Sequence, residues 1–381
     1  MTAFSIAAPA RILFGRGEAA RAASEIKALG NRIFVVHGAD GSRADWLVKA
    51  LRATGRGVLT QACPGEPNLA LLDRATQAAR DFEANVCVGI GGGAALDLAK
   101  AVAALTPAPG NAMDHLEVVG RALPLVAPPL PFVALPTTAG TGAEATKNAV
   151  IGLPDHGRKV SLRDDRMLAR VAIIDPALTD HLPRGVTLAS GIDAITQVIE
   201  PYLSSRANPF CDALAQPAIG KGLRALISLM ETETEQARDD MAWVSLSGGL
   251  ALANSGLGAV HGLAGVLGGT TGAAHGAICG ALIGPVLAAN ARAVPADHPI
   301  APRIREVLDL IGSALGCAPQ NAAGALANWL HAQGLPRLSA LGLAAKDHQA
   351  TAEAALHSSS MKGNPVPLSV ETLVEILEAA G

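Results

Sequence analysis

The chain has 381 residues, of which 50% are hydrophobic, 3% aromatic and 17% charged, and its formal net charge is -3. This apolar content can bury a large core and excludes a disordered chain, which combines low hydrophobicity with high net charge. The 30 Lys and Arg residues balance 33 Asp and Glu residues without forming a basic stripe, so we expect no nucleic-acid partner. The five cysteines form no CxxC pair, which argues against a disulfide framework.

The start of the chain lacks the basic residues and continuous apolar run of a signal peptide. The most apolar regions are interrupted by Gly and Pro before they reach the roughly 18 residues that span a bilayer. We therefore expect a cytoplasmic protein without a membrane partner.

Short apolar runs alternate with amphipathic stretches in the first half of the chain, which predicts parallel strands joined by crossover helices. The predicted strands are Arg32–Val36, Val58–Gln61, Asn85–Ile90, Phe132–Leu135 and Val171–Ile174, and the predicted helices are Ala44–Ala53, Asn68–Phe82 and Ala94–Leu105. We expect this domain, residues 1–182, to be a Rossmann-like parallel-sheet domain.

The composition changes after about Leu182, where long Ala/Leu/Gly segments replace the β-branched runs. These segments predict helices at Gly185–Leu203, Asn208–Met230, Ala237–Gly268, Ala273–Ala293, Ile304–Leu315, Asn321–Ala332 and Ser369–Ala380. The fold class is therefore α/β plus all-α, with a helical bundle domain over residues 183–381.

A run of three glycines, Gly91, Gly92 and Gly93, lies between a predicted strand and a predicted helix in V-G-I-G-G-G-A-A-L-D-L-A-K. Glycines there let the backbone approach a ligand and direct free N–H groups, at the positive end of the helix dipole, toward an anion such as a diphosphate. The alternative is a tight turn with close helix packing.

A second turn, P-T-T-A-G-T-G-A-E from Pro136, also follows a predicted strand. Open α/β sheets bind ligands at this edge, so the two turns strengthen each other as a ligand site, whereas Thr/Gly clusters alone are also common in ordinary loops.

In the helical half, Asp193 and Gln197 are four residues apart and share one face of a predicted helix. His261 and His275 are separated by G-G-T-T-G at residues 268–272, which we expect to end the helix, so each histidine lies on a helix of its own. A carboxylate and two imidazoles form a workable divalent-metal set, whereas each histidine alone is more simply a packed core residue.

Taken together, the GGG-x-x-x-D-x-A-K turn, the P-T-T-x-G-T-G-x-E loop, G-x-D-A-x-T-x-x-x-E and the paired H-G segments resemble the iron-containing (group III) alcohol dehydrogenase superfamily, near its maleylacetate reductase branch. The resemblance implies NAD(P) bound by the first domain, a helical second domain, a cleft between them and a homodimer. It also implies diphosphate contacts from Gly91, Gly92, Gly93 and Asp97, nucleotide contacts from Thr137, Thr138 and Thr141, a lysine at the nicotinamide side in Lys159, and metal ligands in Asp193, His261 and His275.

The chain departs from the family pattern at Gln197 and Gly265, where members carry histidines. Three interpretations follow: Gln197 is a weak oxygen ligand; Asp193, His261 and His275 hold Fe²⁺ or Zn²⁺ with solvent; or no metal binds and His261 or His275 donates the proton. Cys279, one turn after His275, is expected to be buried packing.

Cofactor choice depends on the segment after the first long strand, where Gly38 replaces the acidic residue of NAD-preferring relatives. Without that carboxylate, a ribose 2′-phosphate is not repelled, and Ser42 and Arg43 are near enough in sequence to bind one, which favours NADP(H). Asp40 argues for NAD, and Ser42 and Arg43 could simply cap the next helix.

The expected function is hydride transfer between NAD(P)(H) and a small alcohol or carbonyl, assisted by a metal. The main alternative is a metal-independent, maleylacetate-type oxo-acid reductase, with Lys147, Lys159 and Arg163 as candidates for binding the anion. A lyase of dehydroquinate synthase type and a nucleotide-binding protein with a decayed site are further alternatives.

Overall fold

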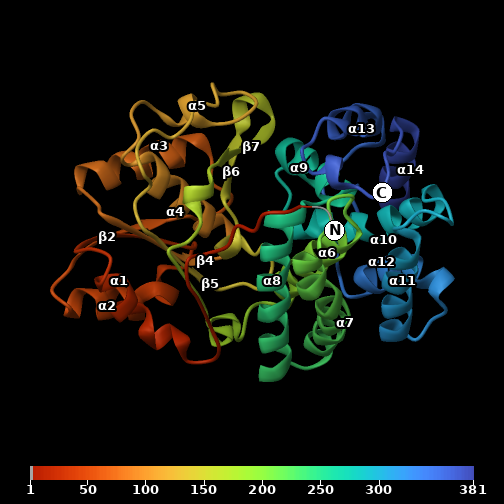
Figure 1. The fold of residues 1–381 in the computed structure, drawn as a ribbon, viewed down its shortest axis with the longest axis horizontal. Coiled ribbons are helices and arrows are strands. Elements are labelled where there is room, and N and C mark those ends of the chain that lie inside the picture. Colours follow the sequence, from red (N-terminus) through yellow and green to blue (C-terminus); the bar gives the residue numbers. More distant parts are fainter. Residues whose placement is uncertain (1–2) are drawn as a thin grey trace. The chain divides into compact units, whose positions relative to one another are not determined.

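The computed structural model describes residues 3–381 and contains two compact units (Figure 1). The α/β unit comprises Ala7–Thr138 and Gly142–Asp180. The helical unit comprises residues 3–6, Ala139–Thr141 and His181–Gly381.

The α/β unit is built on a six-stranded sheet in the order β1-β8-β5-β4-β2-β3, in which every pair is parallel. Its strands are β1 (Ile12–Phe14), β2 (Arg32–His37), β3 (Gly57–Ala62), β4 (Val86–Gly91), β5 (Phe132–Pro136) and β8 (Val171–Ile174). The central strands β4, β5 and β8 are buried throughout, as their continuous apolar runs require. The parallel sheet confirms the predicted fold class of this half.

Helices cover both faces of this sheet, with α1 and α2 on one side and α3 and α4 on the other (Figure 1). The helices of this unit are α1 (Ala22–Lys27), α2 (Asp45–Ala53), α3 (Leu69–Asp81), α4 (Gly93–Leu105) and the short α5 (Ala112–His115). The side chain of Asn68 caps α3 by accepting a hydrogen bond from the N–H of Leu71 at 2.9 Å.

The direction of the chain through the sheet reverses between β2 and β4. The chain runs from β2 outward to β3, returns to β4 on the other side of β2, and continues to β5 and β8. Connections at such a point leave in opposite directions and open a crevice at the carboxyl ends of the strands, where ligands bind. The ends of β2 and β4, with Gly38 and Gly91, lie at this reversal point.

Sequence periodicity missed β1 and an antiparallel hairpin, β6 (Asn148–Leu153) and β7 (Arg158–Arg163). β1 has three residues, too few to show a period, and gains its hydrogen bonds from β8. β7 carries three charged residues, and Gly152 interrupts the short apolar run of β6, so neither strand gives a clear signal in the sequence. Their position against α3 and α4 comes from tertiary packing.

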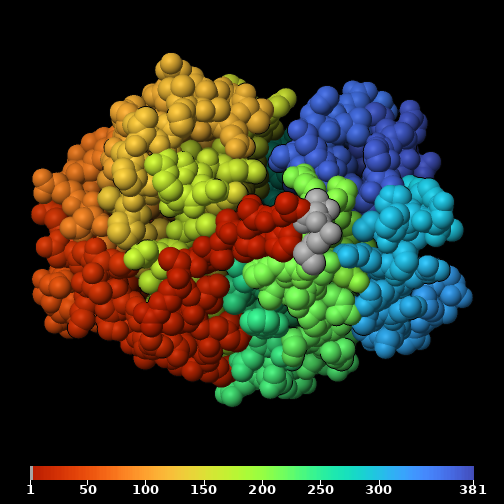
Figure 2. Space-filling model, viewed as in Figure 1, coloured from red at the N-terminus to blue at the C-terminus, as the bar shows by residue number. Residues whose placement is uncertain are grey.

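The helical unit places α10 at its centre, packed against α6, α9, α12 and α14. Its helices are α6 (Arg184–Leu203), α7 (Pro209–Glu231), α8 (Glu235–Ser255), α9 (Ala259–Thr271), α10 (His275–Ala293), α11 (Ala301–Leu315), α12 (Ala322–Ala332), α13 (His348–Leu356) and α14 (Val370–Ala380). The segments that follow α10 lie at the surface of this unit in Figure 2, in light to dark blue.

The predicted single helix Ala237–Gly268 is wrong, because the chain bends by 98° between α8 and α9. Gly256 has a φ of 76°, in the left-handed region that favours glycine, and ends α8. The helix break predicted at residues 268–272 occurs only at the last of these residues. α9 continues through Thr271 and ends at Gly272, whose φ is 68°. The sequence also missed α13.

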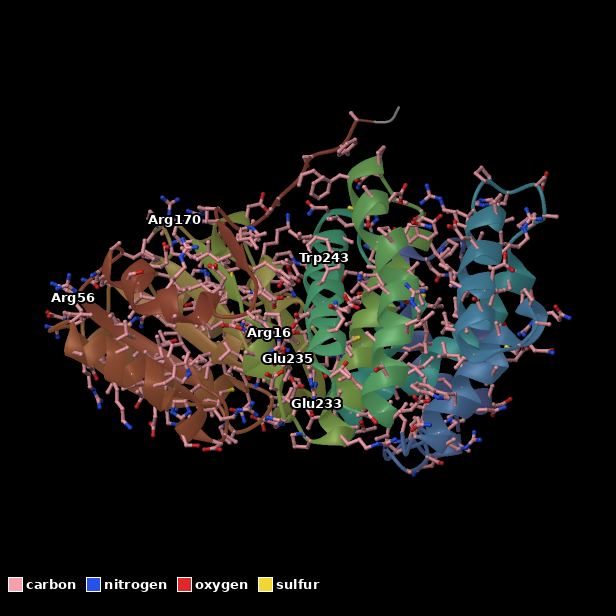
Figure 3. The ribbon with its side chains drawn as sticks, turned by 90° about the horizontal axis from the view of Figure 1, so that it is seen from below. Arg16, Arg56, Arg170, Glu233, Glu235 and Trp243 are labelled. Atoms are coloured by element: carbon pink, nitrogen blue, oxygen red, sulfur yellow. The ribbon has the colours of Figure 1, made fainter. Side chains whose placement is uncertain are left out.

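The beginning of α8 is tied to α6 by the buried guanidinium of Arg238. Its Nη1 donates to Thr187 Oγ1 at 2.9 Å, and its Nε donates to Glu233 Oε1 at 2.9 Å. Glu233, labelled in Figure 3, also accepts a hydrogen bond from the N–H of His181. This charged network orients the helix that carries Asp193.

By length and composition α10 is apolar enough to cross a membrane, and the bent pair α8 and α9 passes the same criterion together. However, 67% of the relevant window of α10 is buried by the rest of the chain. Its apolar character is therefore explained by its place in the core.

Candidate functional site

Three helices of the helical unit bring together four side chains of the types that bind metals. Asp193 on α6, His261 on α9, and His275 and Cys279 on α10 each offer one ligand atom, and these atoms all lie within 4.8 Å of one another. Asp193 Oδ1 lies 3.4 Å from His261 Nε2 and 3.7 Å from His275 Nε2. The structure thus brings together the three residues that the sequence predicted as a set.

Gln197 lies one turn after Asp193 and orients its carboxylate. Gln197 Nε2 donates to Asp193 Oδ2 at 2.8 Å, which leaves Asp193 Oδ1 directed at the histidines. Asp193 Oδ1 and Gln197 Oε1 are both buried, and no hydrogen bond to them is found within the described chain. Because an unpaired buried polar atom costs about 1–3 kcal/mol, these two oxygens indicate a ligand that contacts them.

Glu200, two turns after Asp193 on α6, holds His261 from the opposite side. Its Oε2 accepts a hydrogen bond from His261 Nδ1 at 2.6 Å. The proton on Nδ1 leaves the lone pair of the neutral imidazole on Nε2, facing Asp193. A carboxylate behind a histidine is the usual support of a metal-binding imidazole. The sequence analysis included this glutamate in a motif but assigned it no role.

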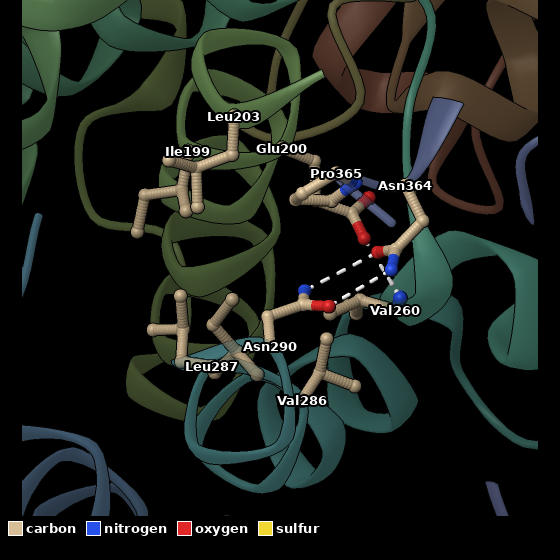
Figure 4. A pocket seen from close by; sticks show the side chains of 11 residues that line it. Ile199, Glu200, Leu203, Val260, Val286, Leu287, Asn290, Asn364 and Pro365 are labelled. Atoms are coloured by element: carbon tan, nitrogen blue, oxygen red, sulfur yellow. Dashed lines mark hydrogen bonds between the residues drawn. The ribbon is translucent and has the colours of Figure 1, made fainter. Parts of the chain in front are cut away.

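Glu200 also caps α9, whose own N-cap residue, Gly258, has no side chain to do so. Glu200 Oε1 accepts from the N–H of Val260 at 2.7 Å, and Asn364 Oδ1 accepts from the N–H of Ala259 at 3.2 Å. Figure 4 shows the paired amides of Asn364 and Asn290 in a small pocket that is also lined by Glu200. The first turn of α9, which carries His261, is therefore fixed by residues distant in sequence.

Cys279 belongs to the cluster, although the sequence assigned it to packing. Its Sγ lies 3.6 Å from His275 Nε2 and 3.9 Å from His261 Nε2. The side chain is fully buried, as expected, but it faces imidazole nitrogens. The available signal was its position four residues after His275, which places both on one face of α10.

The cluster attracts positive charge. Burial opposes protonation of His275, but the neighbouring Cys279 and Asp193 outweigh it and raise the pKa of His275 to about 9. The pKa of His261 is also raised well above its ordinary value, because Cys279, Glu200 and Asp193 outweigh the effect of burial. Burial raises the pKa of Asp193, but the two imidazoles more than compensate and the net pKa is lowered. The donor types, the unpaired oxygens and this charge preference fit a divalent cation.

Gly276 controls how closely the histidine end of α10 approaches α6. A Cβ added at Gly276 would lie 2.2 Å from the carbonyl oxygen of Ala189, so Gly276→Ala must displace α10 and with it His275. We expect this variant to lose about 1–3 kcal/mol of stability and at least about tenfold in metal affinity, measured by thermal unfolding and metal titration.

The matched control is Gly265→Ala on α9, where an added Cβ meets nothing within 4 Å. This control should be as stable as the parent, or slightly more stable, because alanine favours a helix. Equal metal affinity in the two variants would contradict a role for the close approach at Gly276.

In the α/β unit, the predicted phosphate-binding residues meet at the carboxyl ends of β2, β4 and β5. A Cβ at Gly91 would lie 3.2 Å from the nitrogen of Gly38, and one at Gly92 would lie 3.4 Å from Thr138 Oγ1. The N–H of Thr137 donates to the carbonyl of Gly91 at 2.9 Å. Gly92 is the N-cap of α4 and has no side chain for capping. The N–H of Ala95 donates to the carbonyl of Gly92, so the N–H groups of Gly93 and Ala94 are the ones that can bind an anion.

The remaining predicted nucleotide contacts are more dispersed. Asp97 Oδ2 accepts from the N–H of Val150 at 2.9 Å, and burial raises the pKa of Asp97 to about 6. Lys159 Nζ lies 3.5 Å from Glu66 Oε2. The hydroxyl of Ser42 donates to Asp40 Oδ1 at 2.7 Å. Thr141 belongs to the helical unit.

One family model, described as iron-containing alcohol dehydrogenase, matches residues 9–176, and a second, for the C-terminal part of the Fe-containing alcohol dehydrogenase family, matches residues 187–381. The crystal structure of a 1,3-propanediol oxidoreductase covers 100% of both chains with a TM-score of 0.87 and 27% identity.

Two curated relatives are similar in sequence. The probable alcohol dehydrogenase EutG of Escherichia coli is 32% identical over 343 residues, which cover 88% of this chain and 82% of that protein. Long-chain-alcohol dehydrogenase 1 of Geobacillus thermodenitrificans is 41% identical over 227 residues, 59% of this chain and 56% of that protein. The chain therefore aligns with just over half the length of that relative.

Proposed function

Because the chain belongs to the iron-containing alcohol dehydrogenase family of oxidoreductases, which use NAD(P) and a divalent metal, we propose that it transfers a hydride between NAD(P)(H) and a small alcohol or carbonyl with the help of that metal. The observation that supports the proposal best is the cluster of Asp193, His261 and His275 around a buried carboxylate oxygen without a hydrogen-bond partner. A site with those donors suits Zn²⁺ or Fe²⁺.

In this proposal each side chain has a separate task. Asp193, His261 and His275 hold the cation, Gln197 orients the carboxylate of Asp193, and Glu200 keeps the proton of His261 on Nδ1. When bound, the cation supplies Lewis acidity toward an alcohol or carbonyl oxygen and the nicotinamide supplies the hydride chemistry.

Metal removal tests this function. Protein purified without added metal should contain about one equivalent of zinc or iron, and dialysis against a chelator should abolish alcohol-dependent reduction of the nicotinamide cofactor. Adding back Zn²⁺ or Fe²⁺ should restore it. Metal-free protein with unchanged activity would instead support the maleylacetate-type alternative, in which His261 or His275 donates the proton. Nothing in the relatives named above favours that alternative.

The proposed nucleotide site lies at the reversal point of the sheet. There the N–H groups at the start of α4 would bind the diphosphate of the cofactor, with Gly91, Gly92 and Gly93 allowing its approach and Thr137 and Thr138 beside it. The side chains of Asp97 and Lys159 contact other residues of the α/β unit. Their roles as cofactor contacts, and that of Thr141, remain predictions of the sequence.

We further propose a preference for NADP(H), because Gly38 at the end of β2 presents no carboxylate to a ribose 2′-phosphate. Ser42 and Arg43 are exposed nearby in the sequence, where they could bind that phosphate. Their present hydrogen bonds go to Asp40 and to the carbonyl of Leu178, so this preference needs a direct test.

Gly38→Asp should lower the ratio of kcat/KM for NADPH over NADH by at least about tenfold, which corresponds to about 1.4 kcal/mol. The variant should fold normally, because an added Cβ meets nothing within 4 Å. Gly38→Asn is the uncharged control and should change the ratio much less. A parent enzyme that prefers NADH, with no further shift in Gly38→Asp, would contradict the proposal.

The cytoplasmic location, the homodimer and the absence of nucleic-acid and membrane partners remain predictions of the sequence.

A further inference from the structure

We infer that Cys279 is a fourth protein ligand of the metal site and that its thiolate makes the site favour zinc over iron; the inference rests on the metal-assisted function proposed above. Neither the family resemblance nor the chain's sequence pattern assigns this cysteine a role.

The distances among the four candidate donor atoms support this assignment. Around a four-coordinate zinc with bonds of about 2.0 Å to N or O and about 2.3 Å to S, neighbouring ligand atoms are roughly 3.3–3.6 Å apart, and a substrate oxygen would join such a site as a fifth ligand. Cys279 Sγ lies 3.6 and 3.9 Å from the two imidazole Nε2 atoms, and Asp193 Oδ1 lies 3.4 and 3.7 Å from the same two atoms. The sulfur therefore occupies the same relation to the histidines as the carboxylate does.

The surroundings of Cys279 distinguish it from a cysteine that only fills space. Cys63 Sγ and Cys211 Sγ are directed at backbone carbonyl oxygens, at 3.2 and 3.6 Å. Cys279 is also fully buried, but its polar neighbours are imidazole nitrogens that come from two helices. Hydrophobic packing does not require that arrangement, whereas it is the one that ligands of a shared cation adopt.

The assignment also accounts for the missing imidazole at position 197. The amide nitrogen of Gln197 is directed at Asp193 Oδ2, where it supports the carboxylate. Cys279, reaching the cluster from α10, supplies a fourth donor beside Asp193, His261 and His275. Thiolates are soft ligands that bind zinc strongly, so replacing an imidazole by sulfur changes metal preference as well as completing the site.

Substitution of the metal by Co²⁺ detects a metal–sulfur bond directly, through its absorbance. Metal should be removed from the full-length protein with a chelator and Co²⁺ then titrated in without oxygen, while absorbance is recorded. The parent protein should develop a near-ultraviolet sulfur-to-cobalt charge-transfer band together with visible d–d bands. Cys279→Ser should lose the charge-transfer band and bind Co²⁺ and Zn²⁺ at least about tenfold more weakly.

Cys211→Ser is the matched control, because Cys211 is equally buried in the same unit but bonds to the carbonyl of Ala251. It should reproduce the parent spectrum and affinity. Cys279→Ala serves as a second variant that removes any oxygen ligand at this position, and circular dichroism checks that each variant is folded. In competition between equimolar Zn²⁺ and Fe²⁺, the zinc-to-iron ratio retained by Cys279→Ser should fall relative to the parent.

The possible failures are distinguishable. Cobalt binding by the parent without a charge-transfer band, or equal metal affinity in the parent and both Cys279 variants, overturns the role of Cys279 and leaves the proposed function intact. Loss of affinity in Gln197→Leu but not in the Cys279 variants also overturns it, in favour of Gln197 Oε1 as the fourth ligand. A parent protein that binds neither cobalt nor zinc overturns the proposed metal-assisted function itself.

Discussion

Replacing His261 by alanine is expected to lower kcat/KM by at least about 10³-fold, which corresponds to about 4 kcal/mol of transition-state stabilisation. The imidazole is held between Glu200 and Asp193 at 2.6 and 3.4 Å, so its removal takes away a metal donor and leaves Glu200 without its partner. Steady-state oxidation of a panel of primary alcohols, with the metal content determined in parallel, measures the effect.

Binding of the nicotinamide nucleotide should stay within about twofold of the parent, because its proposed site is built from the α/β unit; quenching of protein fluorescence measures it. His348→Ala is the control, since this buried histidine lies on α13 and is not among the clustered ligands. Near-parental turnover in His261→Ala would contradict the assignment of the active site. Loss of turnover in both variants would show a general loss of structure.

Replacing Lys100 by methionine is expected to lower the free energy of unfolding of the α/β unit by about 3–5 kcal/mol. The ammonium group of Lys100 is fully buried and donates to the carbonyl of Ala143, Thr146 Oγ1 and the carbonyl of Asn148 at 2.8, 2.9 and 2.8 Å. These bonds hold α4 to the segment that follows the Gly-rich loop. Urea or thermal unfolding measures the loss, and the exposed Lys49→Met on α2 is the control, with an expected change within about 0.5 kcal/mol.

The deficit should also depend on pH. Burial raises the pKa of Asp97 to about 6 and that of Glu144 to about 7, while the charge of Lys100 opposes both shifts. Carboxyl groups whose folded-state pKa is raised favour the folded state at low pH and cease to do so as the pH rises through that pKa. Without Lys100 the two carboxylates lose their partner, so the deficit should be larger at pH 8 than at pH 5. A deficit that does not change with pH would contradict this electrostatic account.

Much of the architecture could be predicted from short stretches of sequence. The apolar run before Gly91, the glycines that open α4 and the capping side chain of Asn68 each act within a few residues, so they are visible in the sequence. The candidate ligands Asp193, His261 and His275 were found in the same way, because polar side chains on apolar helices require partners.

The prediction of one helix over Ala237–Gly268 failed because contacts distant in sequence outweigh the helix propensity of this segment. The Ala- and Leu-rich segment of α8 and α9 has the composition of one helix, yet it bends after Gly256. The new helix start is stabilised by Glu200 and Asn364, which cap it from about sixty and a hundred residues away in sequence. No window along the segment itself contains those caps.

The two-domain fold class, the glycine turn at the sheet edge and three members of the Asp-His-His-Cys cluster were predictable from the chain, because periodicity, turn chemistry and unpaired polar residues are local properties. The support of His261 by Glu200, the support of Asp193 by Gln197 and the contact of Cys279 with two imidazoles depend on the packing of the folded chain. The physical reason is that a side chain acquires its chemical role from the atoms it meets. For α6, α9 and α10 the contacts between side chains depend on how the helices pack. The spacing of residues along any one helix does not specify that packing.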